Sequence, residues 1–189
     1  MKFLYYNQQI KKILTPATLV ILLFAGTAVV LLKLHTDYAP VSQLKWLLAP
    51  VTFIVEMQSG MPYFFDEAKG YLSADGVIAI GRTCAGINFI IIAWMMAFSM
   101  QWSRKKMMRE RFLTLLYTGF TAYCFGVLVN AFRIIAATGA LSFSDRVEWL
   151  GKHKTHEALG IFIYFSCLLA YYFLLRYRIK TKMPYENIA

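Results

Sequence analysis

Four long runs of apolar residues divide the chain, and polar or charged segments separate them. Their bounds are Ile13–Leu32, Ile87–Trp102, Phe112 to about Ile135, and Ala158–Leu175. Each run is close to the ~20 residues that a helix needs to cross a hydrocarbon core, and none alternates as a strand would. Only helices and closed barrels satisfy their backbone groups inside a bilayer. The pattern therefore predicts an all-α membrane helix bundle with about four transmembrane helices.

The first run is expected to remain in the protein as an anchor. Lys11 and Lys12 precede it, as they would in a secretory signal. However, its apolar stretch exceeds the ~7–15 residues of a signal core, and no small-residue cleavage site follows between Lys33 and Pro40.

Two weaker patterns lie between the first and second runs. The segment Leu44–Met57 is apolar but short, and it contains Pro50 and Glu56, so we expect a short interfacial or re-entrant helix. Further on, Asp75-Gly76 separates two short apolar stretches, which predicts a small β-hairpin or turn.

Composition agrees with a membrane protein of one domain, residues 1–189. Of the 189 residues, 59% are hydrophobic and 16% are charged, against about 25% charged in a typical soluble domain. So much apolar surface excludes a disordered chain and is too much for an ordinary soluble domain of this size. The net charge of +10 would suggest nucleic acid in a soluble protein, but in an apolar chain the position of the charges matters more.

The excess positive charge falls on one side of a four-span arrangement. The basic residues on that side are Lys2, Lys11, Lys12, Arg104, Lys105, Lys106, Arg109, Arg111, Arg176, Arg178, Lys180 and Lys182, against only Glu110 and Glu186. Basic loops stay in the cytoplasm. Both termini are therefore expected to be cytoplasmic, with 34–86 and 136–155 outside, and binding of nucleic acid is not expected.

Three reactive or charged residues fall near the outer ends of different predicted helices. Cys84 precedes the second run, Arg133 lies near the end of the third, and His156 near the start of the fourth. A helix start and the neighbouring Arg82 favour a thiolate, a fixed cation stabilises a thiolate or an oxyanion, and an imidazole can activate a thiol. Asn130 shares a helix face with Arg133 and could hold it.

Each residue also has a non-catalytic interpretation. Arg133 and His156 would then be interfacial anchors and Cys84 an inert thiol at a helix start. Cys124 and Cys167 lie inside apolar runs and are expected to be small buried hydrophobes. His153, His156 and Glu157 resemble half a metal site, but the adjacent lysines repel cations, so no metal is expected. No phosphate loop or Rossmann glycine pattern is present, and no cofactor is expected.

At these residues the chain resembles the exosortase/archaeosortase family of membrane transpeptidases. The family's Cys–small–Gly, Asn-x-x-Arg and His-x-x-x-Gly elements appear in order as Cys84-Ala85-Gly86, Asn130–Arg133 and His156–Gly160. Together with the hydropathy plan they cover about residues 44–175. The chain is similar to the compact exosortases, such as the K type. It departs from the usual pattern by having Ala85 where most members have Ser.

The resemblance implies a cysteine-dependent transpeptidase or protease on the outer face of the bacterial cytoplasmic membrane. Its partners would be secreted proteins that end in a short motif, a membrane helix and a basic tail, together with membrane lipids. Cys84 would attack the scissile carbonyl, His156 would transfer the proton and Arg133 would stabilise the oxyanion, with Asn130, Gly86 and Gly160 in support. A glycan, a lipid amine or water would release the acyl group.

Two other functions compete with this expectation. One is a non-catalytic membrane subunit of a polysaccharide or protein export system. The other is a small transporter, which is disfavoured because the runs lack ionisable residues near mid-span.

Overall fold

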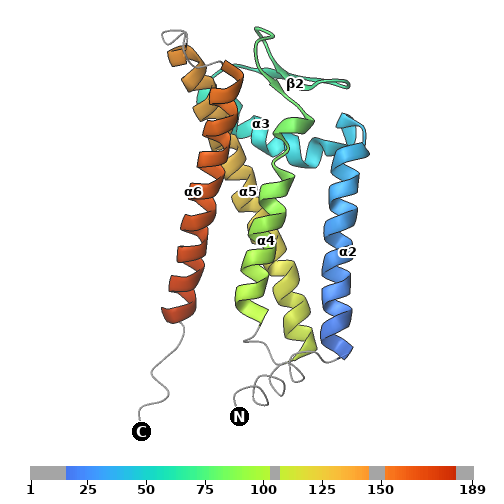
Figure 1. The fold of residues 1–189 in the computed structure, drawn as a ribbon. Helices are drawn as coiled ribbons and strands as arrows, with labels where there is room; N and C mark the ends of the chain where they lie inside the picture. Colours follow the sequence, from blue (N-terminus) through green and yellow to red (C-terminus); the bar gives the residue numbers. More distant parts are fainter. Residues whose placement is uncertain (1–15, 103–106, 145–151, 182–189) are drawn as a thin grey trace.

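Four long helices form the body of the molecule in a computed structural model that describes residues 16–102, 107–144 and 152–181 (Figure 1). They are α2 (Pro16–Tyr38), α4 (Ile87–Trp102), α5 (Met108–Ser144) and α6 (Lys152–Thr181). All four are long and apolar enough to cross a membrane. The predicted all-α bundle with four membrane-spanning helices is therefore confirmed.

The predicted spans and the helices agree best at α4, whose bounds are those of the apolar run. The third and fourth helices extend beyond their runs, to 37 and 30 residues. A helix of 37 residues is about 55 Å long, which exceeds a hydrocarbon core of about 30 Å. Only the part of a helix that lies in the bilayer must be apolar. The length of an apolar run therefore underestimates the length of a helix that continues past the bilayer. The first three residues of the first predicted run lie outside the described residues.

Successive long helices run in opposite directions, and the two ends of the bundle carry different elements. Figure 1 shows α3 and the strands at the end where α2 and α5 finish and where α4 and α6 begin. The opposite end carries five of the described basic residues, Arg109, Arg111, Arg176, Arg178 and Lys180, and one described acidic residue, Glu110.

Helix α3 (Lys45–Ser59), preceded by the 3-10 turn η1 (Val41–Leu44), lies across one end of the bundle (Figure 1). Its 15 residues reach about 22 Å, too short to cross a hydrocarbon core. One face is buried through Leu47, Leu48, Val51 and Val55. The segment predicted at 44–57 is therefore a helix packed across the bundle and not a fifth span.

A proline inside α3 is compensated by a side chain of α5. Pro50 has no N–H, so it cannot donate to the carbonyl of Trp46 four residues earlier. The hydroxyl of Tyr123 donates to that carbonyl at 2.5 Å, and the Tyr123 and Trp46 rings stack with centroids 5.9 Å apart. This contact ties α3 to the middle of α5.

A three-stranded antiparallel sheet joins α3 to α4. Its strands are β1 (Tyr63–Asp66), β2 (Gly70–Ser73) and β3 (Ala79–Ile80), in the order β1-β2-β3. The predicted hairpin around Asp75-Gly76 is confirmed as the β2–β3 connection. Strand β1 was not predicted from the sequence; it pairs with β2 from Tyr63 opposite Ser73 to Asp66 opposite Gly70.

Helices α4 and α5 approach closely, and this contact fixes how the start of α4 lies along α5. A Cβ on Gly126 would lie 2.3 Å from Cγ1 of Ile90, so only glycine permits the crossing. Lower down, the indole of Trp94 donates to the carbonyl of Leu115 at 3.0 Å. Small residues at such crossings are usual between membrane helices. The crossing brings the start of α4 against the upper part of α5.

Candidate active site

Cys84 ends the short 3-10 turn η2 (Arg82–Cys84) between β3 and α4, and its side chain is half-buried. The turn is held by the preceding arginine, whose guanidinium donates to the carbonyl oxygens of Asp37, at 2.7 Å, and Ala39. These carbonyls belong to the end of α2 and the residue just after it. Arg82 therefore fixes the position of the turn. Its Nη atoms donate to these carbonyls at α2, whereas the sequence had predicted that Arg82 would favour the thiolate of Cys84.

The cation beside the thiol comes from α5. Nη2 of Arg133 lies 4.0 Å from Sγ of Cys84, at the limit of a hydrogen bond to sulfur. The guanidinium also lies over the ring of Tyr164 on α6, with its central carbon 5.2 Å from the ring centroid. The structure thus brings together the predicted cysteine and arginine, which are 49 residues apart in the chain.

Asn130 joins three elements through its amide. It is 1% exposed, its Nδ2 donates to the carbonyl of Cys84, and its Oδ1 accepts from the hydroxyl of Tyr164 at 2.7 Å. A carbonyl only accepts, so the amide orientation is fixed, and the tyrosine hydroxyl must be the donor. Asn130 was expected to hold Arg133, whereas the structure shows it holding the backbone of Cys84.

The two motif glycines lie close to these side chains. Gly86 has a φ of 66°, and a Cβ there would lie 3.0 Å from Cγ of Asn130. A Cβ on Gly160 would lie 3.5 Å from Cδ of Arg133, an ordinary contact, so α6 passes the arginine at close range. Ala85, where the resembling family has Ser, is 3% exposed and packs in the apolar cluster beneath α3.

His156 belongs to the first turns of α6, at the same end of the bundle as Cys84 and Arg133 (Figure 1). It precedes Gly160 by four residues, so the two share a helix face about one turn apart. The side chains of His153, His156 and Glu157 lie outside the described residues. The structure therefore assembles the sulfur and the guanidinium, and it places the helical backbone that carries the imidazole.

A cavity of about 440 Å³ opens beside this cluster. Arg133, Tyr164 and the residues flanking Cys84 (Thr83 and Ala85) contribute to its wall. Its other lining residues come from α2, η2, α4 and α6, and include Lys33, Asp37, Arg82, Gly86, Asn88, Phe89, Ile92 and Leu168. Apolar side chains from α4 and α6 form one part of the wall and charged groups from α2 another.

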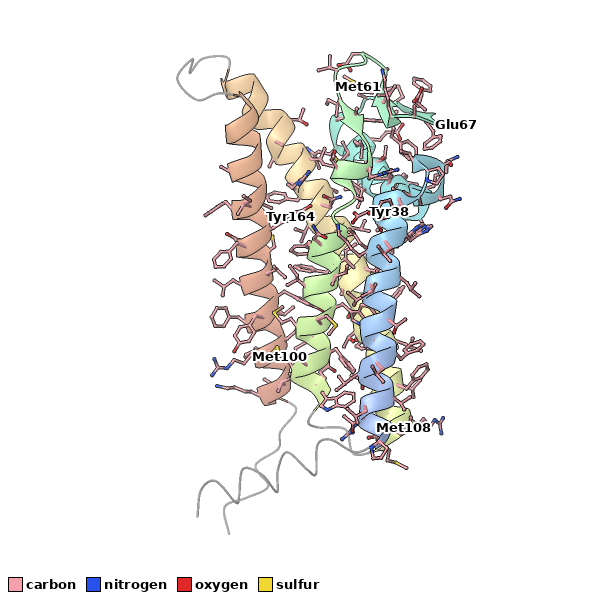
Figure 2. The ribbon with its side chains drawn as sticks, turned by 45° about the vertical axis from the view of Figure 1, so that its right-hand side comes forward. Tyr38, Met61, Glu67, Met100, Met108 and Tyr164 are labelled. Carbon is pink, nitrogen blue, oxygen red and sulfur yellow. The ribbon has the colours of Figure 1, made fainter. Side chains whose placement is uncertain are left out.

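Tyr164 belongs to the site but was not predicted from the sequence. Figure 2 shows it on α6, and its ring packs on that of Phe89 from α4 with centroids 5.0 Å apart. An aromatic residue in an apolar run carries no chemical signature. Its one signal is spacing, because it follows Gly160 by four residues and His156 by eight, on the same helix face.

The other cysteines are not part of this site. Cys124 is exposed on α5 and Cys167 is half-buried on α6. The expectation that both are buried is wrong for Cys124, because an apolar run in a bundle this small also covers the outer surface that faces lipid. Among the described residues, no three His, Cys, Asp or Glu side chains are grouped to hold a metal ion.

Comparison of the chain with protein families, with curated proteins and with solved structures gives no match. The four long apolar helices mark it as a multi-pass membrane protein.

Proposed function

We propose that this protein is a membrane cysteine transpeptidase or protease that processes C-terminal sorting signals of secreted proteins. The observation that carries the proposal is the 4.0 Å approach of the Arg133 guanidinium to the Cys84 sulfur beside an open cavity. A cation beside a thiol favours the nucleophilic thiolate. The order and spacing of the three motifs that resemble exosortases add support that does not depend on this distance.

The reaction follows the chemistry of acyl transfer through a thioester. The imidazole of His156 takes the thiol proton of Cys84, and the resulting thiolate Sγ adds to the scissile carbonyl carbon. The C–N bond then breaks, the same proton goes to the leaving amine, and a thioacyl enzyme remains. An amine or water attacks the thioester and releases Cys84 as a thiol.

Arg133 is suited to act in both acyl-transfer steps. Its guanidinium balances the thiolate before attack and lies where negative charge develops on the carbonyl oxygen. Arginine stays charged at every physiological pH, so this stabilisation needs no proton transfer. Packing against Gly160 and Tyr164 restricts its movement before substrate binds.

The location at one end of the bundle suits a substrate anchored in the membrane. A secreted protein with a C-terminal membrane helix would present the residues just before that helix at the height of Cys84. The basic end of the bundle is then the cytoplasmic end, and the basic tail of the substrate would lie on that same side.

The test is chromosomal replacement of Cys84 by Ala, with Cys124→Ala and Cys167→Ala as matched controls. Mass spectrometry would follow the C-terminal peptides of secreted proteins that end in a helix and a basic tail. We expect Cys84→Ala to retain those peptides fully, Arg133→Gln to slow their removal at least a hundredfold, and both controls to process normally. Membrane levels of each variant, measured by immunoblot, separate loss of chemistry from loss of insertion.

Normal processing by Cys84→Ala at normal abundance would overturn the proposal. The protein would then be a non-catalytic membrane subunit, for example of an export system, and its cysteine would be incidental.

A further inference from the structure

Tyr164 contacts the site twice, through two different parts of its side chain. Its ring lies beneath the guanidinium of Arg133, and its hydroxyl donates to Oδ1 of Asn130 at 2.7 Å. Asn130 in turn donates to the carbonyl of Cys84. One residue of α6 is thus linked both to the cation beside the thiol and to the backbone that carries the thiol.

From this geometry we infer that Tyr164 is a positioning residue that sets the place of the Arg133 guanidinium and of Cys84 relative to each other. The inference rests on the proposed function and names a residue that neither the motifs nor the resemblance indicated. Tyr164 acts through Arg133 and Asn130 and itself forms no bond to substrate.

The ring carries the first half of the argument. An arginine side chain is long and flexible, so placing its cation beside a sulfur requires a second surface. The face of Tyr164 supplies that surface by a cation–π contact, and Gly160 on the same helix lies close to the aliphatic stem. Removing the ring would free the guanidinium to move away from the sulfur.

The hydroxyl carries the second half. Asn130 is a buried residue of α5, and its amide is oriented by the Tyr164 donor from α6 on one side and the Cys84 carbonyl of η2 on the other. Without the hydroxyl, Oδ1 of Asn130 would lose its described partner, and the amide would hold the Cys84 turn less firmly.

The experiment measures alkylation of Cys84 by a membrane-impermeant maleimide in the full-length protein in detergent. All variants carry Cys124→Ala and Cys167→Ala, so Cys84 is the remaining thiol. The thiolate is the reacting form, so the alkylation rate reports how well the Arg133 guanidinium stabilises the thiolate of Cys84. A loosened structure would expose the thiol and speed the reaction, whereas a displaced cation slows it.

We expect Tyr164→Leu to slow alkylation about as much as Arg133→Gln does, roughly tenfold for a cation–π contact in a desolvated site. Tyr164→Phe keeps the ring and should recover most of the rate. In the Arg133→Gln background, Tyr164→Leu should change the rate less than about twofold, because the two residues act as a unit. Tyr171→Phe is the matched control: its hydroxyl is buried without a partner among the described residues, and its removal should leave the rate unchanged.

An unchanged or faster rate in Tyr164→Leu would overturn the inference, and so would full additivity with Arg133→Gln. These results are separate from the fate of the proposed function. If Cys84→Ala processes substrates normally while the alkylation pattern holds, the proposed function fails and the positioning role of Tyr164 stands.

Discussion

Gly86 and Gly60 have nearly the same backbone conformation in very different surroundings. Their φ angles are 66° and 67°, but a Cβ on Gly60 would meet nothing within 4 Å, whereas one on Gly86 would press on the Asn130 amide. That amide is held on both sides and has little freedom to yield. Comparing alanine substitutions at Gly60 and Gly86 therefore separates the free energy lost to the left-handed conformation from that lost to crowding against Asn130.

We expect Gly60→Ala to lower the free energy of unfolding by about 1 kcal/mol, the usual cost of a left-handed non-glycine residue. Gly86→Ala should lower it by about 1–3 kcal/mol more, because overpacking adds to the same backbone cost. Unfolding in detergent, followed by circular dichroism, measures both. Equal losses in the two variants would mean that Asn130 yields without cost and that Gly86 is needed for its φ alone.

Asp75 organises the turn between β2 and β3. The hydroxyl of Ser73 donates to its Oδ1 at 2.5 Å, and the amide of Val77 donates to the same oxygen at 3.0 Å. These hydrogen bonds favour the carboxylate and lower the pKa of Asp75 below its ordinary value of 3.8. The stabilisation is thus complete above 3.8 and is lost as the pH falls through the lower pKa of the folded state.

We expect the Val77 amide to lose protection from hydrogen exchange as the pH falls below 3.8 and through the lowered pKa of Asp75, after correction for intrinsic exchange. Asp75→Asn should show weak protection already at neutral pH and no further change on acidification. Glu67→Gln, in the neighbouring turn, is the control and should behave as the unaltered protein does. An Asp75→Asn protein with the original pH dependence would assign the effect to another group.

At the scale of helices and strands, the bundle could be predicted because burial in a bilayer requires uninterrupted apolar residues. The start of α4 could also be predicted, since the apolar run begins at Ile87, directly after Gly86. Strand β1 was not, because its pairing with β2 is set by the sheet and its sequence shows no alternation of apolar and polar residues. The ends of α5 and α6 were not predicted, because both helices continue beyond the apolar run.

The same physics explains which site residues the sequence revealed. A guanidinium or an amide in an apolar run is costly and therefore visible, so Arg133 and Asn130 stood out. A tyrosine in such a run costs little, so Tyr164 did not. The partner of Arg82 was equally hidden, because carbonyls at the end of α2 carry no sequence signature.

The contact between α3 and α5 includes a hydrogen bond from the Tyr123 hydroxyl to the Trp46 carbonyl, which Pro50 leaves without a backbone donor. We expect Tyr123→Phe to lower the free energy of unfolding by about 1 kcal/mol, because the Trp46 carbonyl loses its donor. Pro50→Ala supplies a backbone N–H to that carbonyl, so Tyr123→Phe should cost clearly less in that background. A double-mutant cycle in detergent measures the difference. Additive losses would show that the hydroxyl does not compensate for the proline.

At the scale of the whole molecule, the two ends of the bundle differ in charge and in structure. Arg109, Arg111 and the last turns of α6 make one end basic, while α3, the sheet and the Cys84 turn form the other. Basic segments are retained in the cytoplasm during insertion. The charge pattern therefore predicts that the sheet and Cys84 face outward, where a secreted substrate would meet them.

Single cysteines at the two ends test this orientation directly. Figure 2 shows Glu67 at the sheet end and Met108 at the opposite end, and both are exposed. In a background with the three native cysteines replaced by Ala, we expect an impermeant maleimide to label Glu67→Cys in intact cells. Met108→Cys should react only after the membrane is permeabilised, and both should react equally in detergent. The reverse pattern would place Cys84 in the cytoplasm, out of reach of any secreted protein, so this single measurement decides whether the proposed substrate class is physically accessible.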